Sequence, residues 1–239
     1  GVVITTLLAK ILCNVNCHYS YRFLFIPETI GAITWLHQNK QNLEKIKHGL
    51  VVTCAGDSGI LTYKKTRHGN TEIDKAVQNT LRFSGNDYSI EEFFPWGSDE
   101  RQFCSPGYNL PFGSLMRTRY GKYNVYHTSG DNTDFVKKPF LIDTFSKYIS
   151  VLFTLENNRF YKNLYPDGEP QLKKRNLLNP IYTLLWILNF SDGENSLLDI
   201  SDKSNIPFEE IITATNELIQ AKLLEEITDV GNKKPDKKF

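Results

Sequence analysis

Strand-like and helix-like stretches alternate over the first two thirds of this chain, and this alternation limits the fold more than any other feature. Runs rich in β-branched and aromatic residues favour strands, whereas apolar residues at helical spacing favour helices. The predicted strands are 21–26, 50–54, 61–65, 88–94 and 114–117, and the predicted helices are 2–12, 30–36, 72–81 and 139–155. Such alternation predicts an α/β domain in which helices flank a mostly parallel sheet.

A second, smaller domain is expected after a turn-rich joint. The joint is Tyr165–Pro170, and the basic run Lys173–Arg175 follows it. Beyond it, Asn179 and Pro180 introduce helices predicted at 181–188, 197–203 and 208–221, with a strand at 223–227. Three helices followed by a strand resemble a winged helix. We therefore expect an α/β domain over 1–165, a winged-helix-like domain over 172–230 and a disordered polar tail over 231–239.

Charge limits the partners that the chain is expected to bind. The formal net charge of the 239 residues is +1, from 28 basic and 27 acidic residues, which gives no indication of a nucleic-acid or membrane partner. Between Asn176 and Ile227, however, the sequence contains nine acidic residues and two basic ones, which gives this segment a net charge of −7. Because such a surface repels the DNA backbone, it disfavours a DNA-binding regulator and favours packing or contact with a protein.

The N-terminal segment and the cysteines bear on where the protein is located in the cell and on whether the chain is truncated. Val2–Leu12 is apolar, but Lys10 interrupts it far short of a membrane span, and no basic region or cleavage site of a targeting peptide is present. The chain opens inside an amphipathic helix without a capping residue, from which we expect an N-terminal truncation. Four cysteines are too few for a disulfide framework, which predicts a reducing, cytoplasmic location. Cys13 and Cys17 have no matching second pair, which disfavours zinc binding there.

One short motif suggests a serine protease, but the rest of the sequence argues against this interpretation. Gly56–Gly59 reads Gly-Asp-Ser-Gly, as around the nucleophile of trypsin-like proteases. That family needs a histidine and an aspartate far upstream and two β-barrels, but 57 residues precede Ser58 and its surroundings are α/β. A turn that follows the strand at 50–54 explains the glycines.

His127 is the histidine most suited to chemistry. Four others, His18, His37, His48 and His68, stand in polar or loop-like surroundings without an acidic neighbour at ligand spacing. His127 follows a strand-like run and precedes Thr128, Ser129 and Asp131, whose oxygens can accept the second N–H of an imidazole.

Three strings carry a resemblance to a known family. They are Tyr21–Gly31 (YRFLFIPETIG), Gly97–Gly107 (GSDERQFCSPG) and Tyr126–Asn132 (YHTSGDN). In this order they resemble the DUF4910 and DUF2172 group of bacterial aminopeptidase-like proteins. These proteins are distant relatives of the M28 class of zinc aminopeptidases, and several carry a C-terminal winged helix. The resemblance covers residues 1 to about 227.

The resemblance implies roles for four residues. Glu28 matches the general base that would deprotonate a zinc-bound water, and His127 matches the last metal ligand. Asp131 matches a residue that supports this histidine, and Asp99, in the Ser-Asp pair before a helix, matches a site-supporting position whose role is open.

The departures from the family pattern limit the metal site. Two-zinc relatives have carboxylate ligands where this chain has Thr29 and Cys54, so a single zinc ion is expected. Since catalytic zinc takes three protein ligands, the remaining His and Asp are expected upstream of residue 1.

The sequence therefore predicts a zinc-dependent aminopeptidase-like hydrolase that acts on a peptide or amide-containing small substrate. The alternative is a non-catalytic fragment or pseudoenzyme that acts as a binding module.

Overall fold

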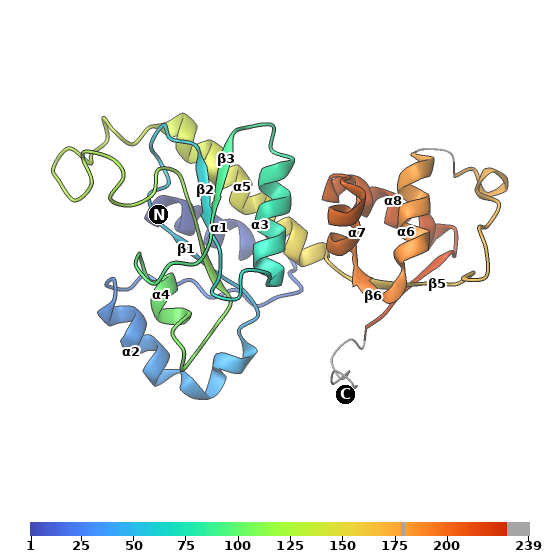
Figure 1. The fold of residues 1–239 in the computed structure, drawn as a ribbon, viewed down its shortest axis with the longest axis horizontal. Helices are drawn as coiled ribbons and strands as arrows, with labels where there is room; N and C mark the ends of the chain where they lie inside the picture. The colour runs from blue at the N-terminus through green and yellow to red at the C-terminus, as the bar shows by residue number, and fades with distance from the viewer. Residues whose placement is uncertain (178–179, 229–239) are drawn as a thin grey trace. The chain divides into compact units, whose positions relative to one another are not determined.

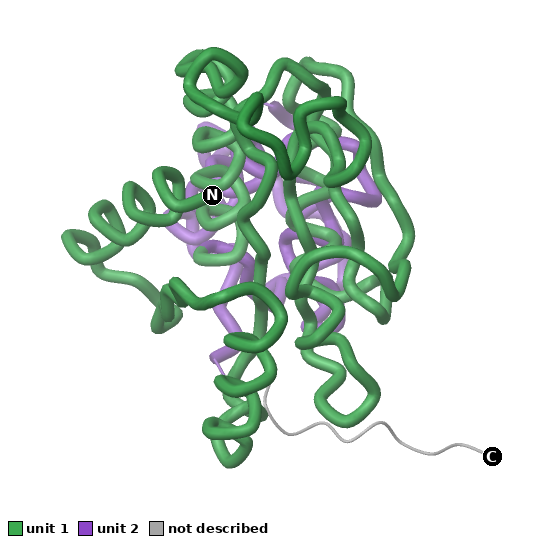
Figure 2. Tube along the Cα trace, turned by 90° about the vertical axis from the view of Figure 1, so that its left-hand side faces the viewer, with its two compact units in different colours: residues 1–156 green, residues 157–239 purple. Residues whose placement is uncertain are grey.

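The computed structural model describes residues 1–177 and 180–228, and the chain divides into two compact units (Figures 1 and 2). The first unit is Gly1–Glu156, and the second begins at Asn157. Asn179, the expected helix cap, and the tail 231–239 lie outside the described residues. No helix of the described residues is long and apolar enough to cross a membrane.

A four-stranded sheet forms the centre of the first unit. Its strands are β1 (Gly49–Val52), β2 (Leu61–Lys64), β3 (Tyr88–Glu91) and β4 (Phe112–Met116), in the order β1-β4-β2-β3. The pairs β1–β4 and β2–β3 are parallel, and β2–β4 is antiparallel. The mostly parallel α/β sheet expected from the sequence is confirmed.

Helices flank this sheet. They are α1 (Val2–Leu12), α2 (Ile30–Gln38), the 3-10 turn η1 (Lys40–Lys45), α3 (Glu72–Arg82), the short α4 (Glu100–Phe103) and α5 (Lys138–Asn157). Helix α1 contacts β1, and α3 contacts β2, β3 and β4. From α5, the fully buried Tyr148 donates its hydroxyl to Leu115 O of β4 at 2.6 Å, which ties this helix to the sheet.

The start of α3 is held by one buried carboxylate. Asp74 is 0% exposed and closes a capping box with Thr71, which is the residue that precedes the helix. It also accepts hydrogen bonds from Tyr63 Oη at 2.9 Å and from Thr66 N at 2.8 Å. Asp74 therefore joins the first turn of α3 to strand β2 and the loop that follows it.

The strand predicted at 21–26 is wrong. These residues form no strand, although they include Leu24 and Ile26, whose side chains pack against an apolar cluster beneath α2. The cluster consists of Ala32, Leu36, Leu43, Phe103 and Leu110. The apolar residues are thus explained by packing against helices rather than by pairing in a sheet, a distinction that a local pattern does not make.

The second unit contains three helices and a three-stranded antiparallel sheet. Its elements are β5 (Phe160–Asn163), the 3-10 turn η2 (Leu172–Arg175), α6 (Ile181–Phe190), β6 (Asp192–Ser196), α7 (Leu197–Ser204), α8 (Phe208–Gln220) and β7 (Leu224–Glu226). The strand order is β6-β5-β7. The predicted helices and the last strand are confirmed, whereas β5 and β6 were not predicted.

The pairing of strand β5 explains where the boundary between the two units lies. It pairs with β6 and β7, so its residues belong with the second unit. The boundary expected near residue 165 falls after β5, whereas the units divide before it, between residues 156 and 157. Between α7 and α8, Asn205 takes a left-handed conformation (φ 53°) that ends α7 and allows the tight turn.

Candidate functional site

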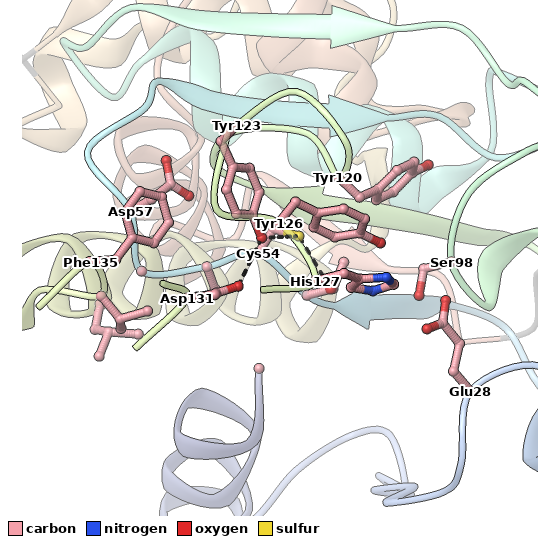
Figure 3. A pocket seen from close by; sticks show the side chains of 16 residues that line it. Glu28, Cys54, Asp57, Ser98, Tyr120, Tyr123, Tyr126, His127, Asp131 and Phe135 are labelled. Carbon is pink, nitrogen blue, oxygen red and sulfur yellow. Dashed lines mark hydrogen bonds between the residues drawn. The ribbon is translucent and has the colours of Figure 1, made fainter. Parts of the chain in front are cut away.

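A pocket lies at one edge of the sheet in the first unit. Because β1 and β4 are parallel, the residues that follow their carboxyl ends meet at the same edge, where ligands bind in many α/β folds. The segment Thr53–Asp57 and the loop after β4 form one side, and Glu28 and Ser98 form another (Figure 3). The cavity has a volume of about 290 Å³. Its polar lining includes Glu28, Cys54, Asp57, Tyr123, His127 and Asp131.

Three of the four residues singled out in the sequence line this pocket. Glu28, His127 and Asp131 contribute to its wall, although about 100 residues of sequence separate the first from the other two. In Figure 3 the imidazole of His127 lies on the side of the pocket where Glu28 and Ser98 are found. Asp99 is not part of the wall. Its carboxylate accepts a hydrogen bond from Thr29 N at 2.7 Å, one residue beyond Glu28.

Asp131 is held by a tyrosine. Tyr123 Oη donates to Asp131 Oδ2 at 3.2 Å and lies 3.6 Å from Cys54 Sγ (Figure 3). Burial, together with the hydrogen bond to Cys54 and the neighbouring charges, raises the pKa of Tyr123 well above its usual range. Its phenol is therefore neutral near neutral pH and remains a hydrogen-bond donor. Asp131 is thus oriented by Tyr123, whereas the sequence suggested His127 as its partner.

His127 is held by an aromatic contact. Its ring stacks on Tyr126 with the ring centroids 4.0 Å apart and an interplanar angle of 16°. The Tyr126 ring in turn meets Tyr123 edge to face at 5.4 Å. Tyr120, Tyr123 and Tyr126 all line the pocket, and their regular spacing of three residues just before His127 is a signal in the sequence that our prediction did not use.

Several residues at or next to the pocket have strained backbone conformations. Three residues other than glycine have positive φ angles there, namely Thr29 (63°), Cys54 (43°) and His127 (57°). Such conformations are sterically unfavourable for residues with a Cβ atom, most of all for a β-branched one, and they persist only where surrounding contacts fix them. Their concentration at one edge of the sheet is typical of a functional site.

The residues at the pocket do not form a complete metal site. Among residues 1–177 and 180–228, no group of three or more His, Cys, Asp or Glu side chains is arranged to hold a metal ion. Catalytic zinc usually takes three protein ligands. The pocket therefore offers one imidazole and several carboxylates, which fit part of a zinc site and are insufficient by themselves.

The Gly-Asp-Ser-Gly motif has a structural role. Asp57 is buried, and its carboxylate accepts hydrogen bonds from Gly59 N at 2.8 Å and from Thr118 N at 3.3 Å. Ser58 is exposed. The motif is the turn after β1 that the sequence predicted, and Asp57 joins it to the residues after β4.

Comparison with known protein families gives two matches that together cover most of the chain. Residues 1–158 match the family model described as "Domain of unknown function (DUF4910)". Residues 159–226 match a model of a winged helix-turn-helix. The winged helix expected from the sequence is therefore confirmed for the second unit.

A curated protein and a crystal structure, both from Clostridium acetobutylicum, are similar to nearly the whole chain. A curated protein named "Putative polysaccharide biosynthesis protein with aminopeptidase-like domain" is 50% identical over 234 residues, which are 94% of this chain and 54% of that protein. A crystal structure of a putative peptidase matches with a TM-score of 0.91 and 51% identity, over 95% of this chain and 53% of that one. This chain thus spans about half the length of the curated relative that it matches.

A more distant structure shows the same fold. A zinc aminopeptidase from Bacillus subtilis matches with a TM-score of 0.53 and 16% identity, over 64% of this chain and 39% of that one. At this identity the likeness concerns the fold alone, and it agrees with the α/β architecture of the first unit.

Proposed function

This chain belongs to the DUF4910 family, and from that membership and the geometry of its pocket we propose that the pocket serves an aminopeptidase-like hydrolase that cleaves peptide or other amide bonds. One observation carries the proposal. A carboxylate, Glu28, and an imidazole, His127, come from distant parts of the sequence and line one cavity at the carboxyl ends of two parallel strands. Proton transfer to and from an attacking water needs such a carboxylate within reach of the substrate.

In this proposal Glu28 is the general base and His127 is a metal ligand. The Glu28 carboxylate takes the proton of the attacking water and returns it to the leaving amine. His127, held against Tyr126, presents its imidazole, and Tyr123 orients the Asp131 carboxylate in the wall of the same pocket. A zinc ion would supply Lewis acidity at the amide carbonyl. Because the described residues hold no complete ligand set, we propose that the other ligands belong to further sequence of the longer proteins in this family.

Metal analysis and hydrolysis test this proposal together. We would measure bound zinc and the hydrolysis of leucine amide for this chain and for the Clostridium acetobutylicum relative, which is about twice as long. The relative should bind one zinc ion and hydrolyse the amide, whereas this chain alone should bind zinc weakly. One tightly bound zinc per molecule of this chain would contradict the proposal of missing ligands. Since that relative is named for polysaccharide biosynthesis, an N-acetylated amino sugar belongs in the substrate panel.

The role of Glu28 has its own test. In a relative that carries glutamate at the position of Glu28, replacing it by glutamine should lower kcat by about 10²–10⁴-fold, because general-base catalysis contributes that much, and zinc should be retained. As a control, the residue of that relative at the position of the exposed Glu92 is replaced by glutamine, which should leave kcat unchanged. Equal activity of the Glu28 variant and the control would refute the assignment.

A binding module is the second candidate, and the incomplete ligand set favours it. If the longer relative neither binds zinc nor hydrolyses any amide of the panel, the pocket is better described as a binding site for an amide-containing ligand. Equilibrium dialysis with the same compounds then decides whether the pocket holds one of them.

For the winged helix we propose contact with a protein rather than with DNA. In α8, the helix that would enter the major groove, Glu209 and Glu210 occupy the first turn and are exposed. Carboxylates at this position repel phosphates. The second unit should therefore show no salt-dependent binding to duplex DNA, and binding that weakens steeply as salt increases would refute the proposal.

A further inference from the structure

The Glu28 side chain is attached to a strained turn. Glu28 O accepts a hydrogen bond from Ile30 N at 2.7 Å, so the chain reverses within three residues around Thr29. Thr29 itself has φ 63° and ψ −70°, the conformation of a γ-turn with positive φ, which is rare and strained. A β-branched residue tolerates positive φ especially poorly, so contacts from elsewhere in the chain must hold it there.

Two side chains from a distant segment supply these contacts. Asp99 Oδ1 accepts a hydrogen bond from Thr29 N at 2.7 Å, and Arg101 donates from a guanidinium nitrogen to Thr29 Oγ1 at 3.2 Å. Both the backbone and the side chain of Thr29 are therefore fixed by residues about 70 positions further along the sequence. Asp99 does not line the pocket, so its carboxylate acts on the turn.

The segment that carries Asp99 and Arg101 is itself anchored to the sheet. Glu100, between them, is 0% exposed and lies 2.8 Å from Lys64 Nζ, which is also 0% exposed and comes from β2. Lys64 Nζ donates in addition to Trp96 O at 2.9 Å and to Tyr120 Oη at 3.2 Å. The ammonium group thus holds this segment at two points, Trp96 and Glu100.

We propose that Asp99 and Arg101 are positioning residues that hold Thr29 in its strained turn and so fix the place of the Glu28 carboxylate, with the buried Lys64–Glu100 ion pair as their anchor. The contacts form one continuous path from the sheet to the pocket: Lys64, Glu100, Asp99, Thr29 and Glu28. The catalytic consequence rests on the proposed function, whereas the positioning of the turn does not.

Amide exchange in this chain tests the positioning without any activity measurement. Asp99→Ala removes the acceptor of the Thr29 amide, and we expect hydrogen exchange at Thr29 to become at least ~10-fold faster. Asp99→Asn keeps a side-chain oxygen that can accept this bond, so exchange should remain close to that of the wild type. Glu92→Ala removes an exposed carboxylate just after β3; it is the matched control and should leave hydrogen exchange at Thr29 unaffected. Unchanged exchange in Asp99→Ala would overturn the inference.

A double-mutant cycle tests whether Asp99 acts on the strain. Glycine adopts positive φ without a steric penalty, so a Thr29→Gly chain needs the carboxylate less. We expect Asp99→Ala to lower the unfolding midpoint in urea less in the Thr29→Gly background than in the wild type. Equal losses in both backgrounds would mean that Asp99 does not act through the strained turn.

Kinetics in the longer relative separate this inference from the proposed function. In a relative that carries aspartate at the position of Asp99, the alanine variant should lower kcat about 10-fold or more with little change in KM, because a displaced base impairs proton transfer more than binding. The asparagine variant should restore most of the rate. If exchange responds as expected but no form hydrolyses any amide, the proposed function fails and the positioning of the turn stands.

Discussion

Removing the charge of Lys64 should strongly destabilise the first unit. Lys64 and Glu100 are both 0% exposed, with 2.8 Å between Lys64 Nζ and Glu100 Oε1. In the described part of the chain, Glu100 Oε2 has no hydrogen-bond partner, and Glu100 Oε1 accepts hydrogen bonds from Lys64 Nζ and from Tyr120 Oη at 3.1 Å. Of these two donors, Lys64 alone carries a charge, so the Lys64 ammonium group is the partner that neutralises this carboxylate. Lys64→Met keeps the apolar stem and removes the ammonium group.

The magnitude follows from the burial. Loss of one partner of a buried ion pair costs about 3–5 kcal/mol, because the remaining charge is left without water or a counter-charge. We therefore expect Lys64→Met to lower the free energy of unfolding of the first unit by about 4 kcal/mol. At roughly 2–4 °C per kcal/mol for a unit of this size, the melting temperature should fall by about 8–16 °C.

The assay is urea unfolding followed by tryptophan fluorescence in a Trp186→Phe background, in which the remaining tryptophans, Trp35 and Trp96, report on the first unit. Lys65→Met is the matched control. Its ion pair with Glu92 is shorter, at 2.6 Å, but the Glu92 side chain is 77% exposed, so the loss should be about 0–1 kcal/mol.

A double variant separates charge from packing. Lys64→Met combined with Glu100→Gln removes both charges of this pair and should recover a large part of the lost stability. A loss of less than about 1 kcal/mol for Lys64→Met alone would refute the reasoning, since that is the cost of an exposed pair.

Three further changes have expected outcomes. Asp74→Ala removes the capping box of α3 and several buried hydrogen bonds and should cost at least about 2 kcal/mol in urea unfolding, whereas a cost near zero would contradict this role. Burial acts to raise the pKa of Glu156, but hydrogen bonds from Tyr21 and from two backbone amides outweigh it and lower the pKa below its usual value. The stabilisation by Glu156 is then present above about pH 4 and is lost as the pH falls through the lowered pKa, so the advantage of the wild type over Glu156→Gln in urea should shrink on acidification; a constant difference would contradict it. Gly97→Ala would place a methyl group against Tyr120 Oη and should cost about 1–3 kcal/mol and shift the near-UV signal of that ring, while an unchanged spectrum and stability would argue against this close approach.

Most of the fold could be predicted because most of its helices and strands have characteristic patterns of apolar and turn residues in the local sequence. Helices α1, α2, α3 and α5 carry apolar residues at helical spacing, and strands β1 to β4 contain aliphatic, β-branched or aromatic residues and lie next to turn residues. The segment 21–26 has the composition of a strand but packs under α2, and β5 is a short run whose pairing with β6 and β7 depends on residues more than 25 positions away. Pairing partners of this kind are not visible in a local pattern.

The candidate site was also predicted only in part from the sequence. Glu28, His127, Asp131 and Asp99 were identified from the resemblance of three strings to a known family, and the structure brings the first three to one pocket. No pattern predicted the Lys64–Glu100 pair, because a lysine on a strand and a glutamate at the start of a short helix are ordinary surface residues in sequence.

The sequence by itself thus determined the α/β class, the helices, the second small domain and the family, because periodicity, turn chemistry and motif strings are properties of neighbouring residues. The tertiary structure alone decided that Asp99 accepts a hydrogen bond from Thr29 N, that Tyr123 donates one to Asp131, and that Lys64 is buried. These contacts join residues 8 to 70 positions apart, and their energies depend on burial and distance, which are fixed when the strands and helices pack together.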